Sequence, residues 1–225
     1  MTGALAIGPG TWRDYERLAE THYLGQRPAT AACILAARCV RSGELAGVLV
    51  VSMPTLNSTW RRSAWGERYE PRGGRARAAR ALNREVRTIS RVLVSPAWRG
   101  LGVGVSLVRA YLASPLTRRT EAIAAMGRYA PIFERAGMRR VRARAPARER
   151  ALRTAFRRAG VAPWRFADAR RVRALAARAG LRDAALAWAR AGKGTRGAAM
   201  SAAAWEVTAL AAMSLTARRA VFVAG

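Results

Sequence analysis

A glycine-rich stretch, Arg-Gly-Leu-Gly-Val-Gly at residues 99–104, is the place in this sequence whose spacing points most directly to chemistry. An apolar run that alternates like a strand precedes it at 86–96, and a segment with helical spacing follows it. Backbone N–H groups in a loop at the start of a helix point into a common space and favour a bound anion. The pattern therefore predicts either a tight structural turn or a loop that holds a phosphate.

The glycine spacing does not match two common nucleotide-binding loops. A dinucleotide-binding fingerprint has its third glycine three residues after the second, whereas Gly104 follows Gly102 by two. A P-loop ends in Gly-Lys-Ser/Thr, which is missing here. Any anion bound at this loop is therefore held in a different way.

The elements around the loop indicate a mixed α/β domain. A short strand is expected at 4–10, followed by a helix with Thr11 as its N-cap. Further strands are predicted at 30–39, 45–53, 86–96, 120–127 and 139–145, and a short helix at 129–138. The basic, Trp-containing segment 56–84 is long for a connection within a compact domain, so it is either functional or mobile.

The character of the sequence changes near Ala147. From there, stretches with helical spacing follow one another, each closed by glycine or a polar break. We therefore predict a first domain at 1–146, which carries the basic insert 56–84, and an α-helical C-terminal extension at 147–225.

Three separate stretches resemble the GNAT acetyltransferase superfamily. Arg99, Gly102 and Gly104 fill the defined places of its Arg/Gln-x-x-Gly-x-Gly/Ala signature. Upstream, Arg-Val-Leu-Val-Ser-Pro-Ala-Trp-Arg-Gly at 91–100 is similar to the strand exit of that family, and 129–138 is similar to its late helix. The resemblance implies a GNAT-like, mostly antiparallel sheet flanked by helices. A looser likeness points to a subgroup that is free-standing or fused to ABC-type ATPases.

The resemblance implies an acetyl-CoA-dependent N-acetyltransferase whose amine acceptor is unidentified. In that family a neutral amine attacks the thioester directly, with the cofactor held by the strand before the loop and by the loop itself. Carried over by position, Val92, Leu93 and Val94 would meet the pantetheine arm. The pyrophosphate would be held by Arg99, Gly100, Leu101, Gly102, Val103, Gly104 and Val105.

The catalytic groups do not all match, because this sequence departs from the family at one position. The usual proton-donating tyrosine precedes Glu-Lys in the late helix, whereas here Phe133 precedes Glu134. Tyr129, about one turn earlier, is either a substitute donor or an aromatic at the helix start, and water is a third route for the proton. Glu85 is either a general base or a solvated charge at the strand entrance. The only histidine, His22, is either a base or a structural residue.

The charge of the chain favours anionic partners. The 41 basic and 13 acidic residues give a formal net charge of +28, and a single residue, Lys193, accounts for all of the lysine. The segment 139–173 alone has 13 arginines and two acids, so it contacts either nucleic acid, an acidic partner or only solvent. The alternative function is thus a GNAT-like nucleic-acid- or partner-binding module with little or no transferase activity. A regulatory domain that partners an ATPase is a third possibility.

Other features set the cellular context. Cys33 and Cys39 have no neighbouring Cys/His cluster, so we expect reduced thiols and no metal site. No apolar run is long enough to cross a membrane, and the N-terminus does not resemble a signal peptide, so we expect a cytoplasmic protein with no membrane contact. Trp60 and Trp65 in the insert either stack on a base, cap an acceptor cleft or pack on the sheet edge.

Overall fold

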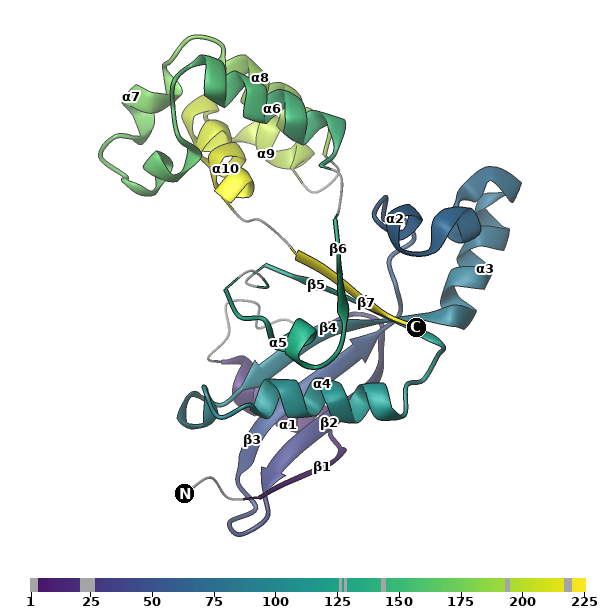
Figure 1. The fold of residues 1–225 in the computed structure, drawn as a ribbon. Helices are drawn as coiled ribbons and strands as arrows, with labels where there is room; N and C mark the ends of the chain where they lie inside the picture. Colours follow the sequence, from purple (N-terminus) through teal and green to yellow (C-terminus); the bar gives the residue numbers. More distant parts are fainter. Residues whose placement is uncertain are drawn as a thin grey trace. The chain divides into compact units, whose positions relative to one another are not determined.

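The computed structural model describes residues 4–20, 27–125, 127, 129–142, 145–192, 195–216 and 220–225. The chain divides into two compact units. One, the sheet unit, comprises Met1–Ala143 together with Arg219–Gly225, and the other, the helical unit, comprises Arg144–Arg218. Figure 1 shows the elements of each unit along the chain.

A seven-stranded sheet, counted over the described residues, organises the sheet unit in the order β1-β2-β3-β4-β5-β7-β6. Neighbouring strands are antiparallel except β4 and β5, which are parallel. The expected fold class, a mixed and mostly antiparallel sheet flanked by helices, is confirmed. The strands are β1 (Leu5–Pro9), β2 (Ala31–Cys39), β3 (Leu45–Ser52), β4 (Val86–Val94), β5 (Arg119–Ala124), β6 (Arg139–Val141) and β7 (Ala220–Ala224).

Strand β3 lies at the centre of the core, and every one of its residues is buried. Val48 and Val50 pack with helix α1 (Trp12–Ala19) on one face, through Tyr15 and Leu18. Leu49 and Val51 belong to the core on the other face, which also contains residues of helix α4 (Val103–Ala113). Because side chains alternate along a strand, this one continuous apolar run supports a helix on each face of the sheet.

The first helix begins where the sequence predicts. The hydroxyl of Thr11 accepts a hydrogen bond from the Asp14 backbone N–H (3.2 Å), and the Asp14 carboxylate accepts one from the Thr11 backbone N–H (3.0 Å). This reciprocal capping box satisfies two N–H groups that the first turn would leave unpaired. The prediction of Thr11 as the N-cap is confirmed.

The basic insert 56–84 is helical and is fixed to the sheet unit. It contains short helices and ends in α3, which leads directly into β4. Trp60 is buried in a small cluster with Val221 and Val223 of β7. Of the roles considered for Trp60, packing is therefore the one that its surroundings support. The helical elements are α2 (Arg61–Trp65), η1 (Gly66–Tyr69), η2 (Pro71–Gly73) and α3 (Arg75–Glu85).

Strands β4 and β5 pair over only part of their length. Their parallel register runs from Val86↔Arg119 to Ile89↔Ala122. Beyond Ile89, β4 continues to Val94 with ladder partners only in β3. The register between β3 and β4 also shifts between Val50 and Val51. A bulge of this kind bends a strand and disrupts the ladder locally. The second half of β4 therefore has an edge without a strand partner among the described residues.

The late elements are shorter than predicted. The helix expected at 129–138 is α5 (Ile132–Arg135), which ends before Gly137, whose φ of 100° lies in the left-handed region. The strands expected at 120–127 and 139–145 correspond to β5 and β6. A 3₁₀ turn, η3 (Pro96–Trp98), and the glycine loop connect β4 to α4.

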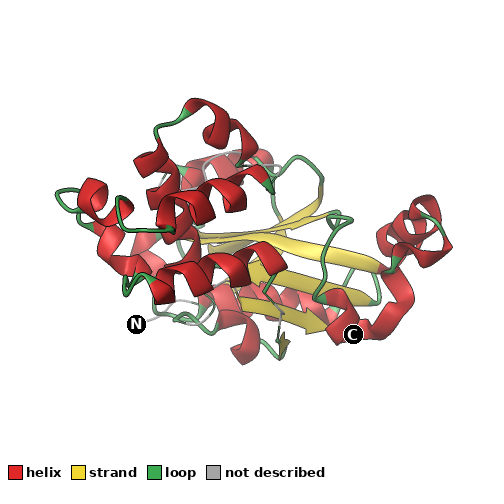
Figure 2. Cartoon of the chain, turned by 90° about the horizontal axis from the view of Figure 1, so that it is seen from above, coloured by secondary structure: helices red, strands yellow, loops and turns green. Residues whose placement is uncertain are grey.

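The helical unit contains only helices and loops among its described residues. Figure 2 shows the helices of the whole chain in red and its strands in yellow. Its core consists of apolar side chains from these helices, including Leu152, Phe156, Trp188 and Val207. The helices are α6 (Ala147–Arg158), η4 (Pro163–Ala167), α7 (Val172–Ala176), α8 (Leu181–Arg190), α9 (Arg196–Ser201) and α10 (Ala204–Thr216).

The C-terminal strand corrects the expected domain division. The extension predicted at 147–225 is helical only to Thr216, because β7 returns to the sheet unit. There it pairs with β5 through Glu121↔Val223 and with β6 through Val141↔Val221. The sequence of β7, Ala-Val-Phe-Val-Ala, is a short apolar run, and periodicity alone does not separate such a strand from a helical segment. The helical unit is thus an insertion before the last strand.

Candidate functional site

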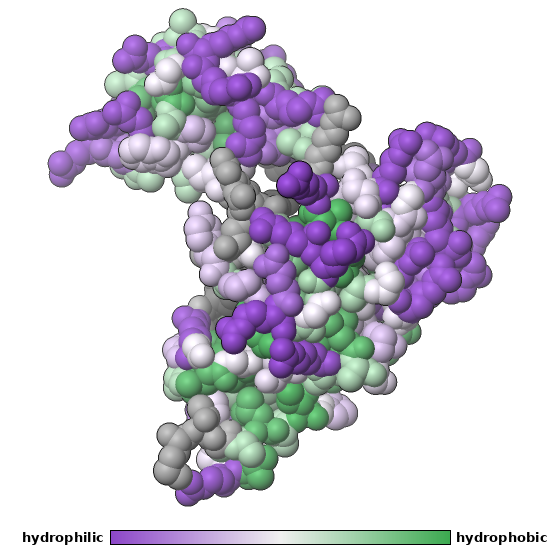
Figure 3. Space-filling model, viewed as in Figure 1, coloured by the Kyte–Doolittle hydropathy of each residue, from purple (hydrophilic) through white to green (hydrophobic). Residues whose placement is uncertain are grey.

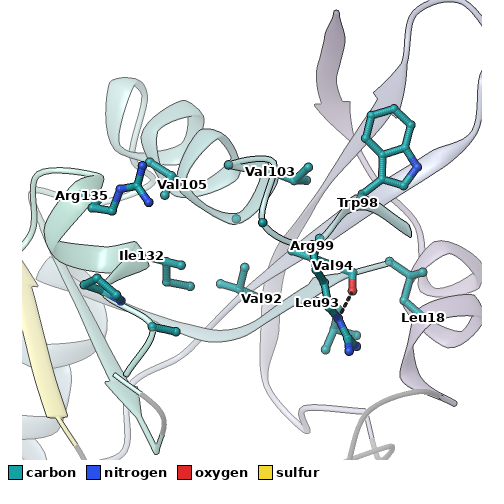
Figure 4. A pocket seen from close by; sticks show the side chains of 15 residues that line it. Leu18, Val92, Leu93, Val94, Trp98, Arg99, Val103, Val105, Ile132 and Arg135 are labelled. Atoms are coloured by element: carbon teal, nitrogen blue, oxygen red, sulfur yellow. Dashed lines mark hydrogen bonds between the residues drawn. The ribbon is translucent and has the colours of Figure 1, made fainter. Parts of the chain in front are cut away.

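A cavity of about 420 Å³ lies at the point where β4 loses its second strand partner. That volume is within the range usual for small-molecule sites. Figure 4 shows Val92 and Ile132 facing this space, with Arg99 and Arg135 on different sides of it. The cavity is lined by Leu18, Val92, Leu93, Val94, Trp98, Arg99, Gly100, Gly102, Val103, Gly104, Val105, Ala130, Pro131, Ile132 and Arg135.

The glycine loop forms one wall of the cavity. Gly100 and Gly102 have φ angles of 79° and 82°, a left-handed conformation that glycine adopts without strain. Gly102 is the N-cap of α4, and no side chain in the described part of the chain caps that helix. The first N–H groups of α4 therefore lack the side-chain acceptor that usually satisfies them. An anion in the cavity would supply the missing acceptor and would be favoured by the helix dipole.

Gly104 keeps room inside the cavity. It is a helical residue, and a Cβ atom added there would lie 3.6 Å from Val92 Cγ1 and 3.7 Å from both Ile132 Cγ2 and Val94 Cγ2. All three neighbours line the cavity. These are ordinary contact distances, so a side chain at Gly104 would enter the cavity without forcing the backbone to move. Gly104 is thus required for the open space of the cavity, whereas Gly100 and Gly102 are required for their left-handed backbone conformation.

The cavity is positively charged and otherwise largely apolar. Of the described residues that line it, two are arginines and none is acidic. Arg99 Nε donates a hydrogen bond to the Val94 carbonyl oxygen (3.3 Å), and Arg109 Nη2 donates one to the Arg135 carbonyl oxygen (2.7 Å). The second bond connects α5 to α4 beside the cavity. The site therefore suits a ligand with an anionic part and an extended, partly apolar part.

Most of the residues predicted to bind a cofactor lie together here. Val92, Leu93, Val94, Arg99, Gly100, Gly102, Val103, Gly104 and Val105 all line the cavity. Leu101 does not, and its side chain is 49% exposed. Arg135 also lines the cavity and was not predicted, although it lies in the late-helix motif. Leu18 was not predicted either, because it is far from the glycine loop in sequence and no local pattern links the two.

Glu85 lies elsewhere, and its surroundings argue against the predicted role of general base. It precedes β4, at the opposite end from Val94, and is not among the residues that line the cavity. Its carboxylate pairs with Arg68 and with Arg118, and it accepts a hydrogen bond from the Tyr69 hydroxyl (2.9 Å). The hydrogen bond from Arg68 is the main reason that the pKa of Glu85 falls to about 2.

A carboxylate with so low a pKa is a poor proton acceptor near neutral pH. Its oxygen atoms are also occupied by hydrogen-bond donors from the insert and from the chain before β5. The structure therefore corrects the expectation for Glu85 and makes it a structural anchor. It is buried, so it is not the solvated charge considered as the alternative either.

A second ion pair, which sequence analysis did not predict, lies near Glu85. Arg61 Nε and Nη2 donate to the two carboxylate oxygens of Glu121 at 2.8 and 2.7 Å, and the Thr88 hydroxyl donates to Glu121 Oε1 at 2.8 Å. The side chains of Arg61 and Glu121 are 3% and 1% exposed. This buried, two-pronged pair attaches the insert to strands β4 and β5.

The aromatic residues of the late helix region have different environments. Phe133 is buried and stacked on Phe222, with ring centroids 5.2 Å apart. Tyr129 is 80% exposed and comes directly before Ala130 and Pro131, which line the cavity. Phe133 thus offers no hydroxyl to the site. His22 lies outside the described residues.

In the described ranges of the chain, no group of three or more His, Cys, Asp or Glu side chains could hold a metal ion. No helix in those ranges combines the length and the apolar character needed to cross a bilayer.

Comparisons with known proteins give similarity to solved structures alone. No family model matches this chain, and no curated protein matches it. One similar structure is a GNAT family acetyltransferase from Brucella melitensis in complex with acetyl-CoA, at 18% identity and a TM-score of 0.40, with 64% of this chain and 91% of that chain covered. Another is a histone acetyltransferase HPA2 and related acetyltransferase from Corynebacterium glutamicum, at 17% identity and a TM-score of 0.38, with 61% and 86% covered.

Proposed function

We propose that this chain is an N-acetyltransferase that takes an acetyl group from acetyl-CoA and transfers it to an amine. The observation that carries the proposal is the parting of β4 from β5 beside a glycine loop at an uncapped helix N-terminus. Together these features provide a strand edge for an extended amide chain and N–H donors for a phosphate, within one cavity. The likeness of residues 91–104 and 129–138 to GNAT motifs supports the same assignment.

The cavity residues fit the two chemically different parts of acetyl-CoA. The N–H groups between Arg99 and Val105, with the positive end of α4, suit the pyrophosphate. Arg135 adds positive charge at the same cavity. The pantetheine arm contains amides, and the half of β4 that ends at Val94 pairs, within the described ranges, with β3 alone. Its other edge is the place where those amides would pair in the manner of a strand.

Acetyl-CoA supplies an activated acetyl thioester. Transfer forms a bond between the amine nitrogen and the acetyl carbon and breaks the carbon–sulfur bond. The amine loses a proton, and the departing sulfur gains one. We assign the first proton to water, since no carboxylate lines the cavity among the described residues. We assign the second to the Tyr129 hydroxyl, because the two residues that follow Tyr129 line the cavity and the Tyr129 side chain is exposed.

The first test is release of free CoA thiol from acetyl-CoA, measured with amines, basic peptides and RNA as acceptors. The wild-type chain is expected to release thiol with at least one amine. Tyr129→Phe should lower kcat by about 10²–10⁴-fold, the usual contribution of a general acid, with little change in acetyl-CoA affinity.

Tyr69→Phe is the matched control, because it removes the same hydroxyl from the Glu85 cluster at the other end of β4. It should leave kcat unchanged. If Tyr129→Phe keeps full turnover, the proton donor is water. A wild-type chain that binds acetyl-CoA and releases no thiol with any acceptor would contradict the transferase assignment.

A further inference from the structure

The helical unit has a large excess of unpaired positive charge. Arg144–Arg218 contains 15 arginines and one lysine against four acidic residues. Twelve of the described arginines are exposed, and only two ion pairs occur among the described residues of this unit, Arg153–Glu149 and Arg171–Asp168. In the view of Figure 3, hydrophilic side chains spread widely over this unit. A surface of this kind attracts polyanions.

One segment of that surface combines charge with an exposed aromatic ring. Pro163–Arg173 contains η4, a turn and the start of α7, and it is attached to the helical core by Phe166 and Val172, which are buried. Phe166 packs edge-on against Phe156, with ring centroids 5.7 Å apart. The tryptophan and the four arginines of this segment are all exposed: Trp164, Arg165, Arg170, Arg171 and Arg173. We call these five residues the Trp164 patch.

Trp164 differs from the other tryptophans of the unit. Its side chain is 67% exposed. By contrast, Trp188 is buried, and the Arg148 guanidinium lies 5.6 Å from the centre of its ring. The Arg173 guanidinium lies 5.2 Å from the centre of the Trp205 ring. A large exposed aromatic surface beside arginines offers a face on which a planar group can stack.

We propose that the Trp164 patch binds single-stranded nucleic acid, with the Trp164 ring stacked on a base and the neighbouring arginines on phosphates. Binding of single strands combines positive charge that follows the backbone with aromatic rings that stack on unpaired bases. The patch has both. The one acidic residue of the segment 163–173, Asp168, pairs with Arg171 (3.2 Å) and accepts a hydrogen bond from the Arg170 backbone N–H (3.1 Å), so its negative charge is already engaged.

The exposed ring favours a single strand over the other polyanions. An acidic polypeptide would use the arginines but would gain nothing specific from an indole face. In a duplex, the base faces are stacked on one another and are not available to Trp164. The proposal concerns the helical unit alone and does not depend on the transferase assignment.

The test is fluorescence anisotropy of the full chain with a labelled single-stranded oligoribonucleotide, its DNA counterpart and the corresponding duplex. Binding is measured from about 50 to about 200 mM salt, the range over which phosphate contacts lose most of their effect. Trp164→Ala should weaken single-strand binding by about 5- to 100-fold, and Trp164→Phe should restore most of it. Replacing Arg165 and Arg170 by alanine should lower the slope of log affinity against log salt by about 1.4, or about 0.7 for each phosphate contact.

Two control variants separate the patch from the general charge of the unit. Met200→Ala truncates another exposed apolar side chain, on α9, and should leave binding unchanged. Arg157→Ala with Arg190→Ala removes the same charge from α6 and α8, and should weaken binding less than the Arg165 and Arg170 pair. Circular dichroism and thermal melting confirm that each variant is folded.

Three results would overturn the proposal. One is unchanged single-strand affinity in the folded Trp164→Ala variant. Another is an equal loss of single-strand affinity when Arg165 and Arg170, or Arg157 and Arg190, are replaced by alanine, which would indicate attraction by net charge alone. The third is displacement of the oligoribonucleotide by polyglutamate of equal charge as readily as by unlabelled single strand, which would point to an acidic protein partner.

Discussion

The two ends of strand β4 differ in how their polar groups are satisfied. At the entrance, near Glu85 and Thr88, the strand has partners on both sides, and nearby carboxylates are held by arginines of the insert. At the exit, near Val94, the strand has one neighbour among the described strands, and it leads into a loop where no described side chain caps the helix N-terminus. The charged side chains at the entrance pair with one another, whereas the backbone N–H donors at the exit face a cavity.

This difference shows which ionisable groups can do chemistry. The sequence does not distinguish a carboxylate near a strand end that acts as a general base from one that acts as a structural anchor. Glu85 is an anchor because arginines occupy it and lower its pKa. The arginines of the cavity, Arg99 and Arg135, have no acidic partner among the residues that line it. Variants at the entrance should therefore change stability, and variants at the exit should change ligand binding.

The largest loss of unfolding free energy is expected from Arg61→Met. It would leave the Glu121 carboxylate buried without its partner, and breaking such a pair typically costs about 3–5 kcal/mol of unfolding free energy. Urea unfolding measures this loss. Adding Glu121→Met removes the orphaned charge and should recover most of the stability.

The affinity for acetyl-CoA should stay near that of the wild type in both folded variants. If Arg61→Met were as stable as wild type, the pair would not anchor the insert. If the folded double variant lost acetyl-CoA binding, the two ends of β4 would not be independent.

Glu85→Gln should lower the unfolding free energy by a smaller amount, about 1–3 kcal/mol. The loss is smaller because two arginine partners of Glu85 are partly exposed to solvent. The pKa of Glu85 is about 2 in the folded chain, below its ordinary value of 4.5. The carboxylate therefore stabilises the fold above about pH 4.5, and this stabilisation is lost as the pH falls from there towards about 2. Unfolding measured from neutral to acidic pH should show a weaker acid dependence in Glu85→Gln than in wild type.

Glu67→Gln is the matched control. Glu67 pairs with Arg62 and Arg72 on the surface, so its removal should cost at most about 1 kcal/mol. Neither variant should lower kcat. A large fall in kcat for Glu85→Gln, with stability intact, would return Glu85 to the role of general base.

The exit end of β4 could be predicted from the sequence, whereas the ion pairs at its entrance end could not. The glycine loop was found because the glycines, the preceding strand and the following helix are local features at fixed spacing. Arg61 and Glu121 are 60 residues apart, and nothing near either one signals the other. Strand β7 was missed for a similar reason, since a short apolar run becomes a strand only through pairing with β5 and β6. The substitution of Phe133 for tyrosine was visible in the sequence, whereas its stacking on Phe222 depends on that same returning strand.

The structure also identifies the better position for testing the site. Gly102 has a left-handed backbone, so any side chain there strains the loop as well as entering the anion site. Gly104 has helical backbone and ordinary contact distances for a Cβ atom. Gly104→Leu therefore fills the cavity while replacing glycine by a better helix former. Gly197→Leu, on α9, is the matched control, because a Cβ there meets nothing within 4 Å.

Calorimetric titration of acetyl-CoA into the wild type, Gly104→Leu and Gly197→Leu tests the central claim most directly. We predict that the wild type and Gly197→Leu bind acetyl-CoA with equal affinity, and that Gly104→Leu melts no lower than wild type but has lost binding. Equal affinity in wild type and Gly104→Leu, or no binding by the wild type, would contradict the account.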